Sequence, residues 1–203
     1  ALGTARRAHA LASVLYQFGQ LLYRCGRFAA ARIAAERSLA LVREHADSRL
    51  LVDDLNLVGS CLQEEGDFDR ARSLLEEGLA VARRAGRERD IGRLLGNRAL
   101  LEKRTGNFDA ARAMYEESIA LQRSADNPEG MIIQSNNLAN LLGIGGQWER
   151  ALQLFVDTLA LCDRTGMAAH RPLLLLNLGR ACHQLGRADD ARRDFGGYFQ
   201  STN

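Results

Sequence analysis

The chain has 203 residues, of which 46% are hydrophobic and 26% are charged, and its formal net charge is +2. This composition is close to that of ordinary globular proteins, which excludes a largely disordered chain. The balanced charge gives no bulk electrostatic reason to expect direct binding to nucleic acid or to a membrane, and no apolar run approaches the roughly 18 residues of a membrane span. Only 2 prolines are present, which favours helices.

The cysteines give no indication of a metal site or a disulfide framework. None of them forms a C-x-x-C pair, and no His/Cys cluster has zinc spacing. We therefore expect free thiols, mostly packed in the interior, in a reducing compartment such as the cytoplasm, and no cofactor. The four residues are Cys25, Cys61, Cys162 and Cys182.

Five glycines recur at intervals of 40 residues: Gly26, Gly66, Gly106, Gly146 and Gly186. Each is followed five positions later by an alanine and preceded seven positions earlier by a glycine or alanine. An aromatic residue follows four of the five glycines by two positions. Such agreement predicts internal repeats. We place five units, at about 8–47, 48–87, 88–127, 128–167 and 168–203, in one domain over residues 1–203.

Each unit is predicted to contain two helices. The stretch before each glycine has helical period, as in Leu55, Val58 and Leu62, and the glycine ends that helix in a left-handed conformation. The second helix carries one apolar stripe at steps of four, such as Ala71 and Leu75. The small residue before each glycine and the alanine after it are expected to face each other, because two helices approach closely only where side chains are small.

The pattern resembles the tetratricopeptide repeat family. That family's A-x3-F motif is matched by Ala111 with Tyr115, by Ala151 with Phe155 and by Ala191 with Phe195. The period of 40 differs from the usual 34, and the closing proline is missing. The longer unit is similar to repeats of kinesin light chains, spindle-orientation adaptors and bacterial regulator sensors. HEAT repeats have similar periods but lack these columns. The resemblance implies an all-α, right-handed superhelix whose first helices line a concave groove.

Amide and basic side chains recur in the columns that this resemblance turns inward. An amide both donates and accepts hydrogen bonds, so a ladder of them can hold a peptide backbone. The alternative is that the amides bond to neighbouring turns and join the repeats. The basic residues favour an acidic partner or a free carboxylate, against the alternative of a solvated charged face. The candidate groove residues are Asn97, Asn136, Asn137, Asn140, Asn177, Arg93, Lys103, Arg104 and Arg180.

No catalytic arrangement is visible in the sequence. The histidines have no metal or triad spacing, and the glycines of "GIGGQW" follow no predicted strand. We therefore expect a non-enzymatic scaffold that binds a peptide or protein segment. The alternative is an effector-sensing or autoinhibitory domain of a bacterial signalling or transcription regulator.

The two ends of the chain suggest a fragment of a longer regulator or adaptor. The sequence starts at Ala1 without methionine, and its last helix ends soon after Phe195, Tyr198 and Phe199. Repeat arrays need polar capping helices. This apolar end is therefore expected either to continue into further chain or to self-associate.

Overall fold

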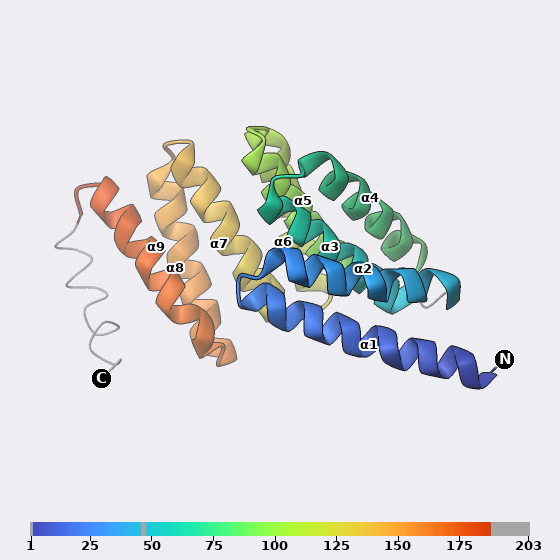
Figure 1. The fold of residues 1–203 in the computed structure, drawn as a ribbon. Helices are drawn as coiled ribbons and strands as arrows, with labels where there is room; N and C mark the ends of the chain where they lie inside the picture. The colour runs from blue at the N-terminus through green and yellow to red at the C-terminus, as the bar shows by residue number, and fades with distance from the viewer. Residues whose placement is uncertain (1, 46–47, 188–203) are drawn as a thin grey trace. The chain divides into compact units, whose positions relative to one another are not determined.

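The computed structural model describes residues 2–45 and 48–187. These residues form nine α-helices and one short 3-10 helix, with no strand among them, which confirms the predicted all-α class. Within the described ranges, no helix is both long enough and apolar enough to cross a bilayer. In chain order the helices are α1 (Leu2–Arg24), α2 (Phe28–His45), α3 (Ser48–Glu65), α4 (Phe68–Arg84), α5 (Glu88–Arg104), α6 (Phe108–Ser124), α7 (Pro128–Ile144), α8 (Trp148–Thr165), η1 (Ala168–His170) and α9 (Arg171–Gln184) (Figure 1).

The chain divides into two compact units, residues 1–105 and 106–203. In unit 1, consecutive helices from α1 to α5 pack on one another, and α3 also contacts α1 and α5. The first helices of the hairpins, α1, α3 and α5, therefore form one layer, with α2 and α4 behind it. In unit 2, α6 packs on α7, α7 on α8 and α8 on α9, and α7 also contacts α9 (Figure 1).

The turns inside the hairpins follow the predicted glycine spacing. All five glycines of the 40-residue series have positive φ, from 68° at Gly186 to 86° at Gly106. A side chain would strain this left-handed backbone, which explains why glycine recurs there. Asp67 then caps the next helix, because its side chain accepts a hydrogen bond of 3.3 Å from the Arg70 backbone N–H.

Small residues bring the two helices of a hairpin together, as the sequence predicts. A Cβ atom added to Gly19 would lie 3.3 Å from the carbonyl oxygen of Ala31. One added to Gly59 would lie 3.6 Å from that of Ala71 and 3.0 Å from Cγ of Leu75. Real side chains rarely pack more tightly than this, so a larger residue at Gly59 would push α3 away from α4.

The interior is built from the same repeated columns. Leu75, Tyr115 and Phe155, which follow the repeated alanine by four positions, are all fully buried. At the first turn the rings of Tyr23 and Phe28 meet edge to face with centroids 5.2 Å apart. The residues assigned to self-association, Phe195, Tyr198 and Phe199, lie outside the described part of the chain.

Candidate functional site

The polar side chains of α1, α3 and α5 form what we call the first-helix face of unit 1. Arg93 on α5 donates to Asp53 on α3 over 2.5 Å and lies 3.2 Å from Asp90 on its own helix. Tyr16 on α1 belongs to the same group, and burial together with the negative charge of Asp53 raises the pKa of its phenol to about 12. The predicted groove residue Arg93 thus has its charge balanced inside the face.

Arg104 is engaged in a similar way at the other end of α5. Its guanidinium donates to Glu64 and to the backbone carbonyl of Gln63, both over 2.7 Å. Its neighbour Lys103 is half-buried and makes no hydrogen bond or ion pair with the described residues. Burial lowers the pKa of the Lys103 ammonium, and the positive charge of Arg104 lowers it further. Lys103 is therefore a cation without an anionic partner in the described part of the chain.

In the middle of this face, amide side chains link α5 to α3 by hydrogen bonds. Asn97 Nδ2 donates to Asn56 Oδ1 over 2.7 Å and lies 3.3 Å from Ser60 Oγ. Gln63 Nε2 donates to the backbone carbonyl of Asn97 over 3.1 Å. Asn97 is thus bonded on its side chain and its backbone to α3, the first helix of the preceding repeat. This arrangement corresponds to the alternative in which the amides join neighbouring repeats.

Unit 2 contains the same amide pair at the equivalent place. Asn177 Nδ2 on α9 donates to Asn136 Oδ1 on α7 over 2.8 Å, and the two residues are 41 positions apart, like Asn56 and Asn97. Both asparagines of the unit 2 pair are buried. The repeat therefore uses one inter-helix hydrogen bond twice, once in each unit.

Three other candidates in unit 2 keep polar atoms available. Asn140 Nδ2 donates to the backbone carbonyl of Asn136 over 2.9 Å, and Asn137 Nδ2 lies at 3.5 Å from Gln134 Oε1. Both asparagines are half-buried, and neither side-chain oxygen accepts a hydrogen bond from the described residues. Arg180 is exposed and makes no ion pair within that part of the chain. We call Asn137, Asn140 and Arg180 the open polar group of unit 2.

The sequence singles out Asn97 and Arg104, but it does not indicate which residues hydrogen-bond to them. Asn56 and Gln63 were not expected to fix Asn97 and Arg104, although a signal was present. Oppositely charged or mutually bonding side chains lie 40 or 41 positions apart, as in Asp53 with Arg93. A search for complementary residues at that interval would have found them.

The described residues offer little for catalysis or metal binding. No group of three or more His, Cys, Asp or Glu side chains among them could hold a metal ion. The four cysteines are free thiols, and three of them are buried. Burial raises the pKa of the Cys61 thiol to about 12, which keeps it protonated and unreactive near neutral pH.

Known structures share the fold over most of this chain. A putative kinesin light chain from Podosopora anserina, with nearly identical TPR-like repeats, is 17% identical with a TM-score of 0.69, covering 94% of this chain and 97% of that one. A signal transduction ATPase with numerous domains and a tetratricopeptide repeat sensor, from Pyrococcus horikoshii, is 12% identical with a TM-score of 0.75, covering 96% of this chain and 31% of that one. A Rap protein complexed with competence and sporulation factor is 12% identical with a TM-score of 0.69, covering 93% of this chain and 61% of that one.

These identities are low, so the structural likeness establishes the fold alone. A comparison with curated proteins finds no match in sequence. Family models described as tetratricopeptide repeat match residues 51–124, 135–165 and 172–193, and these segments include the turns at Gly66, Gly106, Gly146 and Gly186. Together with the hairpins described above, these matches identify the chain as a member of the tetratricopeptide repeat family.

Proposed function

We infer that the chain is a non-enzymatic scaffold that binds a peptide or protein segment through its first-helix faces, and that the open polar group of unit 2 receives a carboxylate of that partner. The family supports an interaction or sensor scaffold in general terms. The carboxylate is our own proposal, and it rests on an imbalance between the two units.

The carboxylate proposal depends on which residue lies 40 positions before each inward arginine. In unit 1, Arg93 has Asp53 at this distance and Arg104 has Glu64, and both arginines form ion pairs with them. In unit 2, Arg180 has the neutral Asn140 at the same distance, and α7 and α9 are in contact. Within residues 2–45 and 48–187 the charge of Arg180 therefore has no anionic partner, and we propose that an external anion supplies one.

A carboxylate fits this group for chemical reasons. An arginine forms its strongest hydrogen bonds with carboxylates, because both partners are charged. The amides of Asn137 and Asn140 supply acceptors for the backbone N–H groups of the same peptide. Lys103 in unit 1 is a further cation that forms no ion pair with the described residues, and it favours an acidic partner. The free thiols fit a reducing compartment, so we place the chain in the cytoplasm.

The proposal is tested by selecting peptides on the intact chain from a displayed random library and measuring affinities of the winners by fluorescence anisotropy. We expect acidic peptides or free C-terminal carboxylates to be enriched. Arg180→Gln should weaken their binding about twofold to fivefold, as expected for the loss of one exposed ion pair. Arg164→Gln removes an exposed arginine of α8 and is the matched control. Enrichment of neutral peptides, or equal losses in both variants, would refute the carboxylate site.

A second candidate function is sensing within a larger regulator. It is favoured by the likeness to the tetratricopeptide repeat sensor of the Pyrococcus horikoshii signalling ATPase, in which the aligned region is only 31% of the chain. On this proposal the same polar group would hold an effector peptide or a neighbouring domain. Sequencing the complete gene tests it, because a flanking ATPase or DNA-binding segment is required.

A further inference from the structure

Helix α1 exposes a row of large apolar side chains on the side that faces away from α3. Val14 is 65% exposed, Phe18 53% and Leu21 58%. The three residues are spaced by four and three positions, so they share one face of the helix. Single exposed apolar residues are ordinary, but a contiguous row of them usually marks an interaction surface.

The same positions are interior in every later repeat. Forty, 80, 120 and 160 residues downstream, the counterparts of these three side chains are all buried except Arg98, which is half-buried. They are Asp54, Leu94, Gln134 and Leu174 for Val14, then Val58, Arg98, Leu138 and Leu178 for Phe18, and Cys61, Leu101, Leu141 and Ala181 for Leu21. The face is thus a standard packing surface of the repeat, and it is uncovered at α1.

The structure shows what covers this surface elsewhere. Each of α3, α5, α7 and α9 packs against the second helix of the preceding hairpin. That helix presents a small residue to the counterpart of Val14: Ser38 Oγ lies 2.7 Å from Asp54 Oδ2, and a Cβ added to Gly78 would lie 3.1 Å from Leu94. Ser118 and Thr158 occupy the equivalent positions and are also buried.

Charge adds a further requirement for a helix that covers this face. Five residues after the small Ser38, Arg43 of α2 donates to Glu77 of the next hairpin over 2.6 Å. The residue equivalent to Glu77 in the first hairpin is Arg37, which carries the opposite charge. A helix that stacks on α1 and α2 in the same way therefore places its own side chain beside an arginine. An acidic residue at that position would restore the pair.

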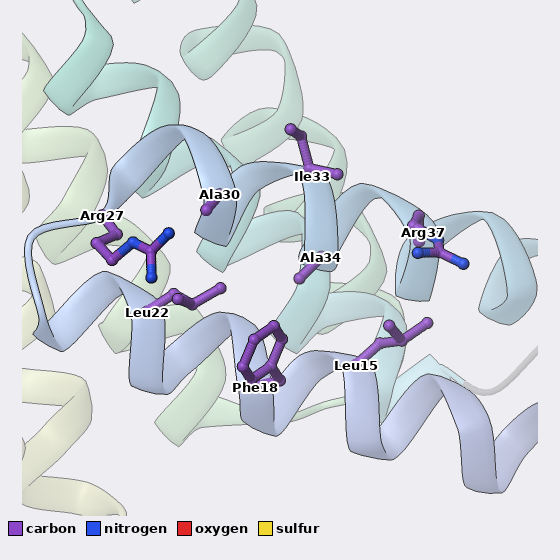
Figure 2. A pocket seen from close by; sticks show the side chains of 8 residues that line it. All are labelled: Leu15, Phe18, Leu22, Arg27, Ala30, Ile33, Ala34 and Arg37. Atoms are coloured by element: carbon purple, nitrogen blue, oxygen red, sulfur yellow. The ribbon is translucent and has the colours of Figure 1, made fainter.

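The surface also holds a recess of suitable shape. A groove of about 260 Å³ runs between α1 and α2, lined by apolar side chains such as Leu15, Phe18 and Ile33. Figure 2 shows Arg27 and Arg37 at its two ends, with the apolar side chains between them. Neither arginine makes an ion pair with the described residues. An apolar groove with an arginine at each end suits an amphipathic helix that places an acidic residue beside one of them.

We propose that the outer face of α1 and α2 is a second binding surface, distinct from the first-helix face, and that it takes an acidic amphipathic helix of a partner. The partner helix carries a small residue opposite Val14 and an acidic residue five positions later, opposite Arg37. Its apolar side chains fill the groove and cover Phe18 and Leu21. The helix thereby completes the stacking that each later repeat obtains from its predecessor.

Helix α8 provides a probe with these features, because Thr158 is its small residue and Asp163 follows five positions later. A fluorescent peptide of residues 148–165, with Cys162→Ala, is titrated against the intact chain. We expect it to bind more tightly than its Asp163→Arg form by about twofold to fivefold, as expected for one exposed ion pair. Arg37→Glu in the protein should reverse this order.

A second pair of variants tests the apolar part of the surface. Phe18→Glu should weaken binding at least about tenfold, because a large apolar contact is lost. Ile144→Glu changes a comparably exposed residue of α7 and should leave binding unchanged. Thermal melts check that both variants remain folded. The probe could also exchange with the protein's own α8, and binding that Phe18→Glu does not weaken would reveal this and overturn the proposal.

The remaining alternative is that a second copy of the chain covers this face. Sedimentation equilibrium of the chain and its Phe18→Glu variant shows whether two copies pair through this face. A monomer that binds the peptide supports the proposal. A dimer that Phe18→Glu dissociates, combined with no saturable peptide binding, would assign the face to a second copy and overturn it.

Discussion

Asn97 Nδ2 donates a hydrogen bond of 2.7 Å to Asn56 Oδ1, joining two first helices of consecutive repeats. The same bond recurs between Asn177 and Asn136 at 2.8 Å. Asparagine is a poor helix former, so its presence in the middle of these helices requires a compensating interaction. The paired amides supply it, and they also fix how far one repeat slides along the next, because the donor and the short-distance acceptor lie on different helices.

Replacing Asn97 should therefore affect stability, whereas replacing Asn137 should not. Asn97→Ala removes a donor and leaves Asn56 Oδ1 without it, which we expect to lower the free energy of unfolding by about 1 kcal/mol. Asn137→Ala breaks only a contact of 3.5 Å and is expected to change it by less than about 0.5 kcal/mol. Urea denaturation of both variants provides the comparison. Equal losses would show that the amide pair does not stabilise the repeat.

The turns and close helix contacts of the fold could be predicted, because they restrict certain positions to glycine or another small residue. Gly66 and Gly106 recur because the backbone there has φ above 80°, and Gly59 recurs as a small residue because Ala71 and Leu75 lie against it. Each of these positions tolerates few residue types, so the period of 40 is visible without any structure. The all-α class and the hairpin turns follow from them.

The role of the polar residues was harder to predict, because an amide can bond equally well to a ligand or to a neighbouring helix. The choice at Asn97 depends on an offset of 41 residues to Asn56, one more than the repeat length, and helix packing sets this offset. Likewise, the sequence directed attention to the C-terminal aromatic residues, while the exposed row at Phe18 was missed. Its apolar character matches that of the buried columns, and only the exposure distinguishes it.

Close packing inside a hairpin gives a second prediction, at Ala71. This residue is fully buried beside Gly59, whereas Ala80 on the same helix is exposed. Ala71→Leu should overpack the contact between α3 and α4 and lower the free energy of unfolding by about 1–3 kcal/mol. Ala80→Leu adds the same atoms at the surface and should be nearly neutral. The model of the hairpin would be wrong if the two variants unfolded at the same urea concentration.

A third prediction concerns the contact between Gly143 and the indole of Trp148. A Cβ atom at Gly143 would lie 2.6 Å from a ring carbon of Trp148, so Gly143→Ala must displace the ring. We expect a loss of about 1–3 kcal/mol and a shift in tryptophan fluorescence, since the chain has 1 tryptophan. Gly145→Ala, whose Cβ would come no closer than 3.5 Å to another atom, is the matched control. An unchanged emission spectrum in Gly143→Ala would contradict the contact.

Asp54 gives a prediction about pH, because its carboxyl is fully buried between α2 and α3. Burial raises its pKa from 3.8 to about 7; the Ser38 hydrogen bond opposes this shift, and the charge of Asp53 adds to it. The geometry fits a protonated carboxyl: Ser38 Oγ lies 2.7 Å from Asp54 Oδ2 and 2.8 Å from the carbonyl oxygen of Ala12. One hydroxyl proton cannot serve both acceptors, whereas a protonated Asp54 can donate to Ser38 while Ser38 donates to Ala12.

The sign of the pH dependence follows from where the proton is held. Between pH 3.8 and about 7 the folded chain keeps a proton on Asp54 that the unfolded chain has lost, so stability decreases as pH rises through this window. Asp54→Asn keeps the neutral hydrogen-bonding pattern at every pH, since its amide can donate to Ser38. The variant should therefore melt at a higher temperature than the natural chain at pH 8, and the difference should shrink toward pH 4. Melting curves of both proteins across this range provide the test, because other titrating groups are common to both and cancel in the difference. A variant that is less stable at pH 8, or a difference that does not change with pH, would show that Asp54 is held as a carboxylate.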